Sequence, residues 1–97
     1  MIISVTEPAP TAIEPIEKWF VYILQCSDDS FYTGITNNLE KRIETHNKRK
    51  GAKYTKTRLP VVLKYFETVE NKSLALKREF AIKKLTRVQK INLINTN

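Results

Sequence analysis

The stretch VYILQCSDDSFYTG, residues 21–34, decides how the fold begins. The aromatic and β-branched run WFVYILQ (19–25) predicts a strand, and FYTGIT (31–36) predicts a second one. Between them, SDDS (27–30) has the composition of a turn. The stretch therefore predicts a β-hairpin with one tyrosine on each strand, Tyr22 and Tyr32.

The length of the hairpin connection decides where these two tyrosines lie. An even-length loop puts Tyr22 and Tyr32 on opposite faces of the sheet, whereas an odd-length loop, such as Asp28-Asp29-Ser30, puts them on one face. Tyrosine is common in strands because it packs well, so the sequence alone favours packing over a role in phosphate binding for both residues. Gly34 indicates a bulge, a bend or a closely approaching ligand, because glycine otherwise weakens a strand.

The rest of the chain predicts one more strand and three helices. The helices are expected over NNLEKRIETHNKRK (37–50) with Asn37 as its cap, over SLALKREFAIKKL (73–85) entered from Asn71 or Ser73, and from a capping box of Thr86 and Gln89 onward. VVLKYFETV (61–69) predicts the third strand, and its apolar opening suggests burial. The order β-β-α-β-α-α indicates an α+β domain with a small three-stranded antiparallel sheet flanked by helices.

Composition and charge limit the kind of partner. Residues 1–17 hold three of the four prolines and no Lys or Arg, which predicts a flexible tail before a single domain at 18–97. The whole chain carries +7; with 17 basic and 7 acidic residues, the part from residue 18 onward carries +10. Such a density favours a polyanionic partner over a merely soluble basic surface.

Other features of the composition suggest a cytoplasmic protein. The single cysteine, Cys26, excludes an intrachain disulfide and suggests a reducing compartment. No apolar run approaches the ~20 residues that a membrane span needs. The N-terminus lacks the pattern of a signal peptide.

Three polar residues on the predicted helices are candidates for chemistry. Arg42 and His46 are an i, i+4 pair at the edge of the apolar stripe, where they either cover the core with their stems or act as a phosphate clamp and a proton-handling imidazole. Glu79 lies between apolar neighbours on its helix. It either forms an i, i+4 ion pair with Lys83 or offers a carboxylate to a hard divalent cation.

The segment from Asn47 to Arg58 carries six cations and no acid. A solvated loop would explain this composition, but cations beside an aromatic residue more often mark a surface that contacts a nucleic-acid backbone. In that interpretation Tyr54 stacks on a base, and the phosphate-contacting residues are Lys48, Arg49, Lys50, Lys53, Lys56 and Arg58.

Taken in order, VYI (21–23), YTG (32–34), Arg42, His46 and Glu79 resemble the GIY-YIG nuclease domain over residues 19–94. GAKYT (51–55) and the last helices look like its small single-domain UPF0213 subfamily. The first motif departs from Gly-Ile-Tyr, and Ile35 follows Gly34 where some DNA-repair members have a lysine.

The resemblance implies a function and a role for each site residue. It implies cleavage of phosphodiester bonds with Mg²⁺ or Mn²⁺, in which Glu79 holds the metal and Arg42 binds phosphoryl oxygens. Tyr22 would help to deprotonate water, Tyr32 would position water or phosphate, and His46 would be a supporting or competing proton acceptor. Gly34 would lie in the same site.

Three classes of function follow from these observations. The first is a metal-dependent endonuclease acting on nucleic acid, DNA more than RNA, with a possible protein partner supplying specificity. The second is a basic nucleic-acid-binding module without turnover. The third is a protein-interaction domain whose basic face meets an acidic partner.

Overall fold

The structure, a computed structural model, describes residues 18–96, so the predicted tail at 1–17 lies outside the described residues. It consists of one antiparallel sheet in the order β2-β1-β3, formed by β1 (Trp19–Gln25), β2 (Phe31–Thr36) and β3 (Val62–Val69). The central strand β1 pairs on both sides, which is why its middle residues, 21–24, are fully buried. The two outer strands each leave one edge unpaired within the described sheet.

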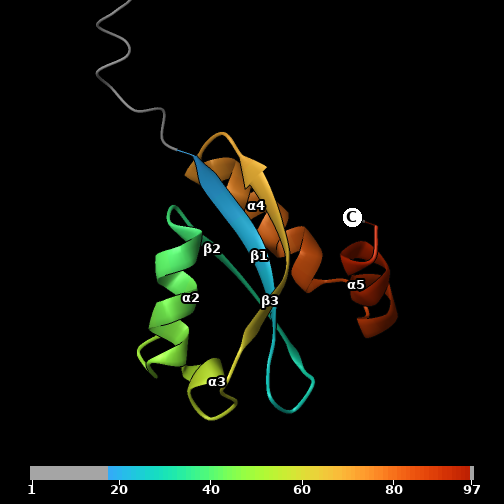
Figure 1. Cartoon of the computed structure of the whole chain (residues 1–97). Coiled ribbons are helices and arrows are strands. Elements are labelled where there is room, and N and C mark those ends of the chain that lie inside the picture. Colours follow the sequence, from blue (N-terminus) through green and yellow to red (C-terminus); the bar gives the residue numbers. More distant parts are fainter. Residues whose placement is uncertain (1–17, 97) are drawn as a thin grey trace, which may run out of the picture.

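Helices cover both faces of this sheet (Figure 1). They are α2 (Leu39–Asn47), α3 (Lys53–Lys56), α4 (Lys72–Lys83) and α5 (Arg87–Ile94). On one face, Leu39 and Ile43 of α2 pack against a cluster that contains Tyr22 and Leu24. On the other face, α4 contributes Ala75 and Ile82 to a core that also contains Val21, Ile23 and Tyr65 of the sheet. The fold class and the order of the predicted elements are therefore confirmed, and α3 is an additional short helix inside the basic segment.

The structure corrects two local predictions and decides a third. The cap of α2 is Asn38, whose side chain accepts a hydrogen bond from the backbone of Lys41, and not Asn37. The third strand is less buried than its apolar opening suggested: Val61 is buried, but Val62 is 56% exposed because β3 is an edge strand. Asn71 is the cap of α4, which resolves the choice between Asn71 and Ser73.

The capping box of α5 agrees with prediction, and the hairpin register decides between the two arrangements that the sequence left open. Thr86 accepts from the backbone of Gln89, and the Gln89 side chain accepts from the backbone of Thr86. In the hairpin, Gln25 faces Phe31, so the connection runs from residue 26 to residue 30 and has an odd length. Tyr22 therefore lies opposite Gly34, Tyr32 lies opposite Leu24, and both tyrosines point to the face that α2 covers.

Candidate active site

Tyr22, Tyr32 and His46 form an aromatic cluster between the sheet and α2. The Tyr22 and Tyr32 ring centroids are 6.4 Å apart, and the His46 ring lies 6.0 Å from Tyr22 and 5.4 Å from Tyr32, edge to face with each. Tyr22 is 1% exposed and His46 has no exposed surface. The Tyr22 hydroxyl and the His46 imidazole are thus packed in a nearly dry environment.

Gly34 gives the Tyr22 ring its place. A Cβ atom at Gly34 would lie 2.6 Å from the Tyr22 hydroxyl and 2.7 Å from its Cζ atom. Because real side-chain carbons do not approach so closely, any other residue at position 34 would displace the phenol. The sequence offered a bulge, a bend or a closely approaching ligand as reasons for Gly34. The group that approaches Gly34 closely is the side chain of Tyr22, on the neighbouring strand.

Hydrogen bonds fix the tautomer of His46. The Thr55 hydroxyl donates to the Ala52 carbonyl (3.0 Å), so its oxygen can only accept from Nδ1–H of His46, which lies 2.8 Å away. With the proton on Nδ1, Nε2 is an acceptor. The Tyr22 hydroxyl, 3.0 Å from Nε2, therefore donates its proton to the imidazole.

The electrostatic environment favours the neutral forms of both partners. Burial, assisted by the charge of Arg42, lowers the pKa of His46 to about 4. Burial raises the pKa of Tyr22 above its ordinary value, while Arg42 acts in the opposite direction through a hydrogen bond and its charge. At neutral pH the pair is therefore a phenol donating to a neutral imidazole.

Arg42 and Glu79 approach this cluster from two helices. Arg42, half-buried on α2, is one turn before His46 and interacts directly with Tyr22. Glu79, on α4, is close enough for its charge to raise the pKa of Tyr22. Its side chain is 19% exposed and forms an ion pair with Lys83 at 3.3 Å. The ion pair considered from the sequence is thus present, and the charge of Glu79 still acts on Tyr22.

The sequence reasoning missed two residues that hold His46 in place. One is Thr55, which is buried on α3 and accepts the Nδ1 proton. The other is Gly51, where a Cβ atom would lie 2.3 Å from Nδ1 of His46 and 2.9 Å from its Cα atom. Both belong to GAKYT, the motif that supported the family resemblance, so the motif itself was the available signal.

The basic segment is ordered by contacts at both of its ends. The Asn47 side chain accepts from the backbone N–H of Val61 (2.8 Å) and donates to its carbonyl (3.2 Å). Arg58 donates to Asp28 in the hairpin turn (3.0 Å) and to the Tyr54 carbonyl (2.8 Å). These contacts close the segment onto the sheet and bring α3 against His46.

Tyr54 and the cations of this segment differ in how free they are to bind a ligand. One face of Tyr54 carries the Arg58 guanidinium, 3.9 Å from its centroid, and the ring is stacked on Tyr32 at 6.2 Å. Arg58 is engaged in the contacts given above, and Lys48 pairs with Glu44 at 3.2 Å. The remaining cations of the segment are exposed: Arg49, Lys50, Lys53 and Lys56.

Glu79 could bind a divalent ion only together with waters and substrate phosphates. Within residues 18–96, no group of three or more His, Cys, Asp and Glu side chains comes together to hold a metal. Mg²⁺ keeps several waters and is commonly bound by one or two carboxylates together with substrate phosphates. A single carboxylate such as Glu79 suits that kind of binding, and does not suit a site built from protein ligands alone.

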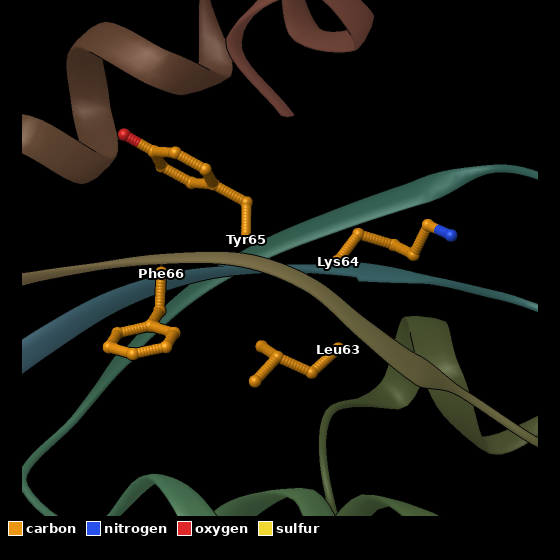
Figure 2. Close-up of a pocket in the computed structure, with 4 residues that line it drawn as sticks. All are labelled: Leu63, Lys64, Tyr65 and Phe66. Carbon is orange, nitrogen blue, oxygen red and sulfur yellow. The ribbon is translucent and has the colours of Figure 1, made fainter. Parts of the chain in front are cut away.

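A hollow separate from the candidate site lies along β3. Its volume is about 500 Å³, and it is lined by Leu63, Lys64, Tyr65 and Phe66. Figure 2 shows Leu63 and Phe66 pointing to one side of the strand and Lys64 and Tyr65 pointing to the other. Because none of the candidate site residues lines this hollow, its size does not mark the place of the chemistry.

Comparison with known proteins connects this geometry to a family. The model of the GIY-YIG catalytic domain matches residues 18–92, which include the whole cluster described above. The chain belongs to the GIY-YIG nuclease family. The matched residues include Tyr22, Tyr32 and Gly34, on which the resemblance was based.

Relatives place the GIY-YIG domain of this chain in the UPF0213 subfamily. A UPF0213 protein of Clostridium perfringens is 62% identical over 77 residues, covering 79% of this chain and 83% of the relative. One of Staphylococcus haemolyticus is 57% identical, covering 79% and 94%. The solution structure of a UPF0213 protein from Bacillus halodurans is similar with a TM-score of 0.52 at 40% identity, covering 79% of this chain and 82% of that one. None of the helices described over residues 18–96 is long and apolar enough to cross a membrane.

Proposed function

We propose that this protein is a divalent-metal-dependent endonuclease that hydrolyses phosphodiester bonds, with DNA rather than RNA as its substrate. The observation that carries the proposal is the buried hydrogen bond from Tyr22 to Nε2 of His46, beside the guanidinium of Arg42. A domain that only binds phosphate needs cations, but it has no use for a proton acceptor fixed in one tautomer. Membership of the GIY-YIG nuclease family agrees with this chemistry.

The hydrolysis is derived from the protonation states of Tyr22 and His46. The pKa of Tyr22 is raised, so its oxygen carries a proton at neutral pH and can accept the proton of water only while it passes its own to His46. The water oxygen then forms a bond to phosphorus, and one phosphorus–oxygen ester bond breaks. The water proton moves to Tyr22, the Tyr22 proton moves to Nε2, and the leaving oxygen takes a proton from solvent.

The other site residues act on charge and position. Arg42 binds the phosphoryl oxygens with its fork of donors and offsets the negative charge of the transition state. Tyr32, against the His46 ring, positions the water or the phosphate. Glu79 is the residue that would hold Mg²⁺ or Mn²⁺, which when bound neutralises charge on the phosphate and the leaving oxygen.

One observation favours the second candidate, a nucleic-acid-binding module without turnover. Ile35 stands where some DNA-repair members of the family have a lysine, so the site has one cation fewer to lower a tyrosine pKa. Lys83, on α4, already shares its charge with Glu79 in an ion pair. The two candidates differ in one measurable respect, the effect of Glu79 on cleavage.

The test compares wild type with Glu79→Gln and Arg42→Ala on single-stranded, duplex and branched DNA and RNA, with Mn²⁺ or Mg²⁺ and with EDTA. Glu79→Gln should lower cleavage by orders of magnitude while binding persists or strengthens, because a negative charge near the phosphate is removed. Arg42→Ala should weaken both binding and cleavage.

Matched melting temperatures must accompany the comparison, since a partly unfolded variant would also lose activity. Lys77→Gln, on the exposed surface of α4, serves as the control for a charge change that should leave cleavage intact. Equal metal-dependent cleavage by wild type and Glu79→Gln would reject the role given to Glu79. Binding without cleavage of any substrate would favour the binding module.

A further inference from the structure

A second cavity adjoins the candidate active site at the unpaired edge of β2. Its volume is about 200 Å³, and it is lined by Phe31, Tyr32, Thr33, Tyr54, Lys83 and Lys90. Neighbouring side chains of a strand point to opposite faces, so a cavity bordered by three consecutive residues of β2 lies against the edge of that strand. Residues from α3, α4 and α5 complete the cavity wall.

Two lysines give this cavity a positive charge. Lys83 and Lys90 line it from α4 and α5, and the ammonium of Lys83 is also the ion-pair partner of Glu79. The opposite wall is aromatic, and Tyr32 belongs both to that wall and to the cluster around His46. A negatively charged ligand that reaches this cavity would therefore lie directly beside the proposed reaction centre.

Thr33 supplies an independent indication of a polar occupant. It is 4% exposed, and its Oγ1 atom has no hydrogen-bond partner among the described residues. A buried hydroxyl without a partner is costly and uncommon in native proteins. A ligand in the cavity that Thr33 lines could supply the missing partner.

The aromatic wall favours a phosphate over a stacked base. Tyr54 carries the Arg58 guanidinium on one face and is stacked on Tyr32, so less of its ring is available to a base. This modifies the base-stacking role expected for Tyr54 from the sequence. What the cavity does offer is two lysine side chains and the edge of β2, next to the buried hydroxyl of Thr33.

We infer that this cavity is a subsite for the backbone phosphate next to the scissile one, with Lys90 as its main cation. This inference rests on the proposed function, because it assumes a nucleic-acid strand crossing the site. Lys83 shares its charge between this phosphate and Glu79, and the hydroxyl of Thr33 donates to the bound strand. By holding one phosphate, the subsite positions the neighbouring phosphate of the strand at Arg42 and Tyr22.

The experiment uses oligonucleotides in which one phosphate at a time is replaced by a neutral methylphosphonate. All binding is measured with proteins that carry Glu79→Gln, so that no strand is cut. The reference has Glu79→Gln alone and takes the place of wild type; the two others add Lys90→Gln or Thr33→Val. A methylphosphonate at the phosphate that occupies the subsite should weaken wild-type binding about tenfold, because it removes a charge-assisted hydrogen bond. In Lys90→Gln the same replacement should have almost no effect, and the slope of log K against log salt should fall by about one.

Thr33→Val separates a binding role from a structural one. Since the hydroxyl has no partner in the free protein, valine should leave the melting temperature unchanged or raise it, while affinity falls several-fold. Lys64→Gln on β3, the opposite edge of the sheet, is the control for the loss of one charge. Full affinity in Thr33→Val, or an equal methylphosphonate penalty in wild type and Lys90→Gln, would overturn the subsite.

The outcomes also separate this inference from the proposed function. If the protein with Glu79 cleaves but the loss of binding caused by the methylphosphonate does not depend on Lys90, the nuclease proposal is supported and the subsite is contradicted. A Lys90-dependent penalty without cleavage of any substrate supports the subsite and contradicts the nuclease. Failure of the wild-type protein to bind any oligonucleotide overturns both.

Discussion

At the scale of the residue, the site depends on which group donates each proton and which accepts it. Nε2 of His46 can accept a hydrogen bond from Tyr22 only because Nδ1 carries the proton and donates to the Thr55 hydroxyl. The Thr55 oxygen accepts because its own hydrogen is donated to the Ala52 carbonyl. Three successive hydrogen bonds thus fix which nitrogen of the imidazole carries the proton. His46 is the only histidine of the chain, so its state can be measured without ambiguity.

Thr55→Val should disturb the tautomer of His46 without removing the imidazole. Valine keeps the shape of threonine but cannot accept the Nδ1 proton, so ¹⁵N chemical shifts of His46 should move toward a mixture of tautomers. If the proposed function holds, kcat/KM should fall, by no more than the roughly 10²- to 10⁴-fold that general acid–base catalysis contributes.

Thr55→Ser is the matched control, since serine retains the hydroxyl. It should preserve the His46 signals and most of the activity. Unchanged His46 shifts in Thr55→Val would show that threonine does not set the tautomer.

At the scale of the element, the basic segment from Asn47 to Arg58 forms most of a constrained connection between α2 and β3. Asn47 binds the backbone of Val61 as a neighbouring strand would, and Arg58 ties α3 to the hairpin turn through Asp28. The backbone N–H of Ser27 also donates to the Arg58 carbonyl (2.9 Å). Lysines of this segment are therefore presented on a fixed surface, which lowers the entropy lost when a nucleic-acid backbone binds.

Neutralising Lys50, Lys53 and Lys56 together should weaken nucleic-acid binding and flatten its salt dependence. Removing one lysine–phosphate interaction should reduce the slope of log K against log salt by about one, so removing all three should reduce it by about three. The measurement is a binding titration at several salt concentrations.

A triple variant at Lys64, Lys72 and Lys77 carries the same loss of charge on β3 and α4 and serves as the control. It should leave the slope close to that of wild type. If both triple variants changed the slope equally, net charge would be acting rather than this segment.

At the scale of the whole molecule, burying a histidine between the sheet and two helices links folding to pH. The pKa of His46 is about 4 in the folded state and about 6.5 when unfolded. Between these values the unfolded chain binds a proton that the folded chain does not, so stability falls as pH falls from about 6.5 toward 4. Below about 4 both states are protonated and this contribution changes no further.

The free energy of unfolding should therefore drop by on the order of 2 kcal/mol between pH 6.5 and 4.5 because of His46. Urea unfolding of wild type and His46→Gln across this range measures the contribution. The variant should be less stable at pH 6.5 but should lose less on acidification. Parallel pH dependences for the two proteins would show that His46 is not the group responsible.

The sequence by itself determined the elements and their order. Apolar periodicity, the turn composition of SDDS and the capping box of Thr86 and Gln89 are local signals, and local signals survive in any tertiary context that respects them. The residues of the candidate site were also reachable, because VYI, YTG, Arg42, His46 and Glu79 occur in the order of a family motif. That recognition placed them in one site before any distance was known.

Only the tertiary structure decided what these residues do to one another. The sequence left open whether the two tyrosines share a face, and the odd connection at 26–30 settles that they do. Neither the partner of Nδ1 nor the cavity at the edge of β2 could be inferred, because both join residues from separate elements. The exposure of Val62 and the engagement of Arg58 depend on strand order and on a contact spanning 30 residues, and one-dimensional patterns carry neither. Composition fixes which groups are available, whereas burial and distance fix their protonation and their partners.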